Sequence, residues 1–200
     1  MLKNYSLTCI CIAIILAVVT NICFAQNTEI SANIGLAGFS EFSFLQPDWN
    51  LEGNFIRAIN RSGYFDFQFG RSHNDAPFGY DGLRSHNLIS RNVVYVTAAY
   101  GNYLKTSESG KFYFSYKGGI SFRKANDVVL DSVSRNTGEE DLYSHFDVHY
   151  NPGIMAGIDM EWILCKPIGL HLDPEFYFFT KDGITLMLNV GIAYRFGKSD

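Results

Sequence analysis

The sequence predicts an all-β protein, an eight-stranded antiparallel up-and-down β-barrel that crosses a membrane. Three observations lead to this fold class. Apolar and polar residues alternate with a period of two through most of the chain after residue 25, as in strands with two unlike faces. Several of these segments are longer than ordinary globular strands and reach the roughly 9–11 tilted residues that cross a bilayer. Short and long connections also alternate between them, as in membrane barrels.

Composition narrows the class of protein further. The chain has 200 residues, of which 47% are hydrophobic and 16% aromatic, which excludes an unfolded chain. The formal net charge is −4, whereas a nucleic-acid-binding protein needs a basic surface, so we expect no nucleic-acid partner.

Residues 1–25 resemble a cleaved export signal. Lys3 precedes an apolar run from Leu7 to Val19, which is shorter than the roughly 20 residues of a membrane helix. Cys23-Phe24-Ala25 offers a cleavage site before Gln26, which leaves residues 26–200 as the barrel domain. Only Cys165 then remains, so the mature chain cannot form an internal disulfide.

Eight alternating segments follow in order. We predict strands at 29–39, 49–59, 63–71, 91–103, 111–123, 153–165, 168–179 and 184–196. The fourth segment is apolar on both faces from Val93 to Val96, which leaves its facing open. The predicted connections 72–90 and 124–152 are long, whereas Lys166-Pro167 is a tight turn.

The two faces of each strand differ in bulk as well as polarity. Large apolar side chains on one face suit lipid, and small or polar ones suit the narrow interior of eight strands. In the last strand we expect Leu186, Leu188, Val190 and Ile192 in lipid, with Asn189, Gly191 and Arg195 inside. A soluble ligand-binding barrel is the alternative and would place the apolar faces inward.

Aromatic residues near the predicted strand ends suit the girdles that flank a membrane barrel. Near the short turns these are Tyr100, Tyr103, Phe112, Trp162, Tyr194 and Phe196. Trp49, Phe78 and Tyr150 fall toward the long connections.

The pattern, the size and the export signal together resemble the small eight-stranded outer-membrane β-barrel family, which includes the membrane domain of outer membrane protein A. Asn151-Pro152-Gly153-Ile154 and the terminal Tyr194-Arg195-Phe196 are most similar to the porin-family barrels of Bacteroidetes. The resemblance implies a bacterial outer-membrane location and contact with outer-membrane lipid. It also implies that Tyr194 and Phe196 are read by the barrel assembly machinery during biogenesis.

Charged residues on the inward faces form the first candidate site. Lys117, Asp159, Glu161, Asp173 and Glu175 fall at similar depths on neighbouring strands, and His171 lies among them. Side chains at one depth can pair along the wall, so we predict a network of ion pairs that fills the lumen.

Two groups of histidines form further candidates. His145, Asp147 and His149 alternate on one face and could hold a divalent metal, although a hydrophilic loop would contain such residues too. Lipid A deacylases, which are also eight-stranded, carry a His-x-Ser-Asn arrangement on a strand. Ser72-His73-Asn74 and Ser85-His86-Asn87 place Ser before His, so they do not match it.

These observations favour a non-enzymatic structural or surface-binding protein without a cofactor, acting as a monomer. The long connections 72–90 and 124–152 are its candidate contact surfaces, since loops on a rigid scaffold often bind. An outer-leaflet lipid hydrolase and a narrow passive channel are the alternatives.

Overall fold

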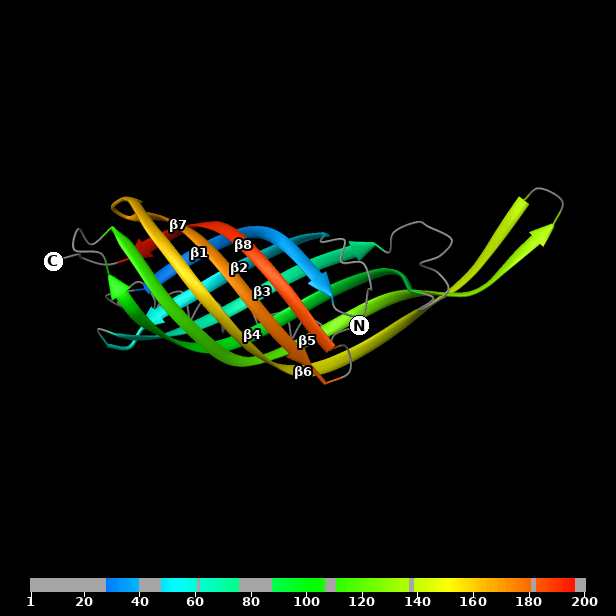
Figure 1. Ribbon diagram of the computed structural model, residues 1–200, viewed down its shortest axis with the longest axis horizontal. Helices are drawn as coiled ribbons and strands as arrows, with labels where there is room; N and C mark the ends of the chain where they lie inside the picture. The colour runs from blue at the N-terminus through cyan, green and yellow to red at the C-terminus, as the bar shows by residue number, and fades with distance from the viewer. Residues whose placement is uncertain are drawn as a thin grey trace, which may run out of the picture.

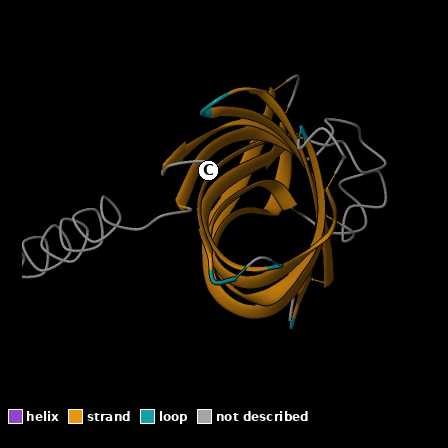
Figure 2. Cartoon of the chain, turned by 90° about the vertical axis from the view of Figure 1, so that its left-hand side faces the viewer, coloured by secondary structure: helices purple, strands orange, loops and turns teal. Residues whose placement is uncertain are grey.

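Eight antiparallel strands pair in chain order, and the first pairs with the last, in the computed structural model of the chain (Figure 1). The structure describes residues 28–39, 48–60, 62–75, 88–106, 111–136, 139–180 and 183–196. The strands are β1 (Thr28–Phe39), β2 (Asp48–Ala58), β3 (Gly63–Asp75), β4 (Leu88–Thr106), β5 (Phe112–Asn136), β6 (Glu139–Cys165), β7 (Ile168–Phe179) and β8 (Gly183–Phe196). Figure 2 shows them as a closed ring, which confirms the predicted fold class.

The barrel has two unlike ends. The connections β2–β3, β4–β5 and β6–β7 are short and lie at one end, the short-turn end, where β1 begins and β8 ends. The other four connections lie at the opposite end, which we call the long-connection end after the two longest of them, β1–β2 and β3–β4. The predicted export signal, residues 1–25, and Phe78 of the predicted outer girdle lie outside the described residues.

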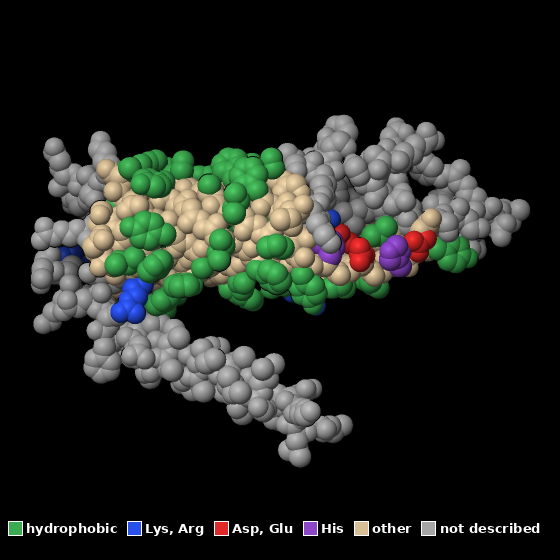
Figure 3. Space-filling model, turned by 90° about the horizontal axis from the view of Figure 1, so that it is seen from below, with side chains coloured by type: hydrophobic (Ala, Val, Ile, Leu, Met, Phe, Trp, Pro, Cys, Tyr) green, Lys and Arg blue, Asp and Glu red, His purple; other side chains and the backbone are tan. Residues whose placement is uncertain are grey.

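Exposed apolar side chains from all eight strands form a belt on the barrel wall, one face of which is seen in Figure 3. Leu186, Leu188, Val190 and Ile192 are each 42–61% exposed, whereas Asn189 between them is fully buried. The same alternation exposes Phe67 on β3, Ile120 on β5 and Phe176 on β7. Large apolar side chains outside and polar ones inside reverse the order of a soluble protein, so this surface suits lipid. No helix among the described residues is long and apolar enough to cross a membrane.

β4 resolves the facing that the sequence left open. Val93 and Tyr95 are buried in the lumen, and Val96 and Tyr100 are exposed on the wall. Tyr103 shares the inward register, and its ring lies 5.0 Å from that of buried Tyr64. Its assignment to the girdle near the short turns was therefore wrong, because its place in the two-residue period turns it into the barrel mouth.

The predicted long loop 124–152 is for the most part strand, which corrects the sequence interpretation. β5 continues to Asn136 and β6 begins at Glu139, so the two form a ribbon beyond the barrel (Figure 1). Residues 143–148 are all exposed, so burial no longer alternates between the two faces of the strand there. In the predicted loop 72–90, β3 extends to Asp75 and β4 starts at Leu88.

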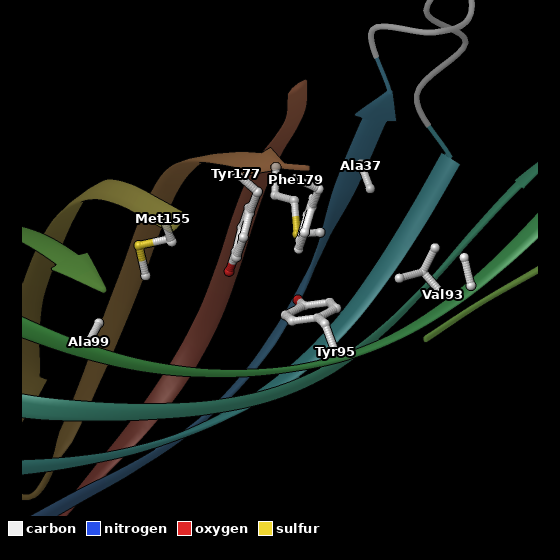
Figure 4. Packing of buried hydrophobic residues seen from close by; sticks show 9 residues of the cluster. Ala37, Val93, Tyr95, Ala99, Met155, Tyr177 and Phe179 are labelled. Carbon is white, nitrogen blue, oxygen red and sulfur yellow. The ribbon is translucent and has the colours of Figure 1, made fainter. Parts of the chain in front are cut away.

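The part of the lumen nearest the long-connection end contains an apolar cluster. Tyr95 and Tyr177 pack edge to face, with ring centroids 5.7 Å apart, and Tyr177 stacks on Phe179 (Figure 4). The cluster comprises Ala37, Val93, Tyr95, Ala99, Ala125, Met155, Tyr177, Phe179 and Met187. Below it, the lumen side chains are predominantly polar.

Candidate functional site: the polar lumen and the outer arm

A buried lysine joins two carboxylates at the middle of the lumen. Lys117 Nζ on β5 lies 3.0 Å from Asp66 Oδ2 on β3 and 2.7 Å from Glu175 Oε1 on β7. All three side chains are almost completely buried. Gly157 lies between Lys117 and β7, and a β-carbon there would lie 3.4 Å from Lys117 Cε, so the absent side chain lets the lysine reach Glu175.

Neutral side chains complete this central group. Gln68 Nε2 donates to Asp66 Oδ2 at 3.0 Å and to Glu175 Oε1 at 2.6 Å. The Tyr177 hydroxyl lies 3.0 Å from Glu175 Oε2 and 3.1 Å from Gln68 Oε1. Because β3 and β7 are four strands apart in a ring of eight, these bonds cross the lumen from wall to wall.

A second polar group lies around Glu52 on β2. Glu52 accepts hydrogen bonds from the Tyr95 hydroxyl at 2.7 Å and from Asn33 Nδ2 at 3.1 Å. Asn33 Nδ2 also faces Asp173 Oδ2 on β7, at 3.4 Å, and Asn50 donates to Asn189 Oδ1 at 2.9 Å. β1, β2, β4, β7 and β8 are thereby linked through the interior.

A third group closes the short-turn end. His171 on β7 lies with Nδ1 2.9 Å from Asp159 Oδ1 and Nε2 2.9 Å from Glu29 Oε1. Arg195 on β8 binds Glu29 through Nε, at 2.8 Å, and Glu161 through Nη2. These residues come from β1, β6, β7 and β8, so the group spans the seam where the ring closes.

The predicted lumen residues are all buried, but their partners differ from the predicted pairing of neighbouring strands along the wall. Lys117 contacts Glu175, whereas Asp159 and Glu161 belong to the His171 and Arg195 group at the short-turn end. Sequence reasoning placed Glu29, Glu52 and Asp66 on polar faces without assigning them to the network. Alternation gave their inward facing, but pairing was expected only between neighbouring strands, whereas Lys117 on β5 meets Asp66 on β3 and Glu175 on β7.

The predicted metal trio lies on the outer part of β6, where its members meet separate partners. His145 Nδ1 lies 2.7 Å from Asp131 Oδ1, and His149 Nδ1 lies 3.9 Å from Asp127 Oδ2. Asp147 is opposite Asp127 in the β5–β6 register. Asp127 is also bound by Arg91 through Nε and Nη2, at 2.9 and 2.8 Å. A metal held by the trio stays a prediction.

The serine and histidine of the 72–74 segment point in opposite directions. Ser72 is fully buried in the lumen, whereas His73 is half-buried on the outer face and stacks on Trp49. Neighbouring strand residues face opposite sides, so Ser72 and His73 cannot form a nucleophile and base pair. Ser85, His86 and Asn87 lie outside the described residues.

We call the outer ribbon the arm: residues 130–136 of β5 and 139–152 of β6. It lies beyond the last β4–β5 pair, Leu88 with Val129, and the last β6–β7 pair, Gly153 with Phe179. Its described side chains include Phe146, which is 80% exposed, and the exposed rings of Tyr143 and Tyr150. At its base, acidic and histidine side chains gather beyond the apolar belt (Figure 3).

Solved structures with the same fold are outer-membrane proteins. Ail, the attachment invasion locus protein of Yersinia pestis, has 14% identity and a TM-score of 0.55 over 86% of this chain and 100% of its own. Neisserial surface protein A has 12% identity and a TM-score of 0.58 over 84% of this chain and 97% of its own. OprG from Pseudomonas aeruginosa has 11% identity and a TM-score of 0.58 over 87% of this chain and 97% of its own.

Comparison by sequence gives nothing: no family profile matches the chain, and no curated protein does. The structural likeness confirms the expected fold of a small eight-stranded outer-membrane barrel. The closer resemblance to barrels of Bacteroidetes stays a prediction.

Proposed function

We propose that this chain is a non-enzymatic barrel of the bacterial outer membrane that binds partners outside the cell through its arm. The observation that carries the proposal is the arm itself, a two-stranded ribbon that continues the barrel wall past the apolar belt. A barrel that needed only to span the membrane would have no use for such an extension. Loops and ribbons on a rigid scaffold are the usual carriers of binding.

The surface of the arm supports a contact role. Phe146 is 80% exposed and Tyr143 is 56% exposed, beyond the belt of the barrel. Exposed aromatic side chains are enriched where proteins meet partners, because they bury much area on binding.

Charge indicates the kind of partner. The arm carries five acidic residues against one basic residue, Arg135. Ail has been solved with the heparin analogue sucrose octasulfate. The negative charge of this arm would repel such a polyanion and favours a partner with a cationic surface.

Site-specific photocrosslinking in intact cells tests the proposal. A benzophenone amino acid replaces Phe146 on the arm or, as the matched control, Ile154 on the belt, which is also well exposed. We expect protein or polysaccharide adducts from position 146 and lipid adducts alone from position 154. Lipid adducts alone from both positions would refute the contact role.

Two alternatives are separated by simple assays. A narrow channel would give steps of conductance in planar bilayers. The bonds that Gln68 and Lys117 make across the lumen argue against such a channel. A lipid hydrolase would change the mass spectrum of lipid A when the protein is expressed. Ser72 and His73 face opposite sides of the strand, which argues against such an enzyme.

A further inference from the structure

Three potential metal ligands converge at the short-turn end of the lumen. Glu29 on β1, Glu161 on β6 and His171 on β7 each offer one ligand atom, and these atoms lie within 4.8 Å of one another. His171 Nε2 lies 2.9 Å from Glu29 Oε1 and 3.7 Å from Glu161 Oε1. All three side chains are more than nine-tenths buried.

The converging atoms lack hydrogen bonds. Glu29 Oε1, Glu161 Oε1 and His171 Nε2 are each buried without a hydrogen-bond partner, even though His171 and Glu29 are within ion-pair distance. A buried polar atom without a partner is costly, and three of them facing one point are better explained by an ion that binds them all.

The opposite atom of each ligand is held by the protein. Arg195 donates from Nε to Glu29 Oε2 and from Nη2 to Glu161 Oε2, so one guanidinium orients both carboxylates. His171 Nδ1 lies 2.9 Å from Asp159 Oδ1. Because a carboxylate only accepts, Nδ1 carries a proton. Nε2 faces Glu29 Oε1 in the same way, so it must give up its own proton when a metal binds there. Outer partners of this kind orient the ligands of metal sites in proteins.

We propose that Glu29, Glu161 and His171 bind one divalent transition-metal ion of the zinc class at the short-turn end of the lumen. One imidazole nitrogen and two carboxylate oxygens form a donor set that zinc accepts, with water as a fourth ligand. Two ligands at tetrahedral zinc lie about 3.3–3.4 Å apart, given bonds of roughly 2.0–2.1 Å. The measured 2.9 and 3.7 Å bracket that separation.

Charge balance and access agree with the proposal. Once His171 has lost its Nε2 proton to the incoming ion, the carboxylates of Glu29, Asp159 and Glu161 outnumber the cation of Arg195, and a divalent ion offsets the excess. The Arg195 side chain is 30% exposed at the short-turn end, which gives an ion a route to the site. The ion would tie β1, β6 and β7 together beside the β1–β8 seam.

The experiment is calorimetric titration of the EDTA-treated full barrel in detergent with zinc chloride. We expect one zinc ion per chain and a higher urea midpoint with zinc than without. Glu161→Gln replaces the anionic carboxylate with a neutral amide, whose oxygen is a weaker ligand for zinc. Gly169→Ala keeps all ligands, but its new β-carbon would collide with Glu161 Oε1 and displace that flexible carboxylate. Each variant should bind zinc at least about tenfold more weakly.

The control is His73→Gln, in the grouping of Asp48, His73 and Asp75 at the other end of the barrel. Its zinc affinity should equal that of the wild type. The proposal is overturned if the wild type binds no zinc, if only His73→Gln loses binding, or if Gly169→Ala folds and binds as tightly as the wild type. In the first case, ¹⁵N spectra should show His171 protonated at both nitrogens, as in a cluster of ion pairs alone.

Discussion

Removal of the Lys117 charge should destabilise the barrel strongly. Lys117→Met keeps most of the side-chain volume but leaves Asp66 and Glu175 buried without their cation, which lies 3.0 and 2.7 Å away. Removing one partner of a buried ion pair costs about 3–5 kcal/mol, because the remaining charge is uncompensated. With an m-value of about 2 kcal/mol per molar urea, the midpoint should fall by roughly 1.5–2.5 M.

The assay is urea unfolding in lipid vesicles, followed by tryptophan fluorescence. A triple variant, Lys117→Met with Asp66→Asn and Glu175→Gln, removes the charges together and should regain most of the loss, because buried ion pairs can be replaced by neutral groups. Arg57→Met, at an exposed cation on β2, should change stability by no more than about 0.5 kcal/mol. A loss below about 1 kcal/mol for Lys117→Met, or no recovery in the triple variant, would refute the reasoning.

Three further predictions concern the wall, the orientation and the export signal. Leu188→Arg should lower the free energy of unfolding in lipid by about 2–4 kcal/mol, and Asn189→Arg should lower it less. A spin label on Leu188→Cys should be accessible to oxygen but not to a polar nickel reagent. Shielding of the label from both reagents would place Leu188 inside protein. Cys165, exposed near the β6–β7 turn, should react with an impermeant maleimide only after the outer membrane is opened. Phe146→Cys in a Cys165→Ser background should react in intact cells, and the reverse pattern would invert the orientation. The mature protein should begin at Gln26 by mass spectrometry, and a mass that includes residues 1–25 would contradict cleavage.

Strands that separate two unlike environments could be predicted closely. The predicted 168–179 and 184–196 differ from β7 and β8 by at most one residue at either end. Lipid on one side and a polar lumen on the other impose opposite residue types at alternate positions, so the period is strong. The outer half of β6 does alternate, with His145, Asp147 and His149 on one face and Phe146, Val148 and Tyr150 on the other. Both faces are largely exposed there, and the segment was interpreted as a loop.

Contacts within the lumen depend on information that alternation does not contain. Lys117 stands opposite Gly157 in the β5–β6 register, yet its charge reaches past that strand to Glu175 on β7. The meeting of Glu29 with His171 depends on ring closure and on the stagger between strands. Both are properties of the whole barrel, so inward facing could be predicted while pairing could not.

Closure of the ring also sets an order of events for assembly. The β1–β8 ladder, from Thr28 with Phe196 to Phe39 with Thr185, joins residues at opposite ends of the described chain. The other seven ladders join consecutive strands and can form as local hairpins soon after each strand is available. In a flexible chain without those hairpins, bringing ends about 170 residues apart together would cost on the order of 4–5 kcal/mol in chain entropy. Until the last strand arrives, β1 keeps an unpaired edge, so insertion cannot be completed by any shorter chain that lacks β8.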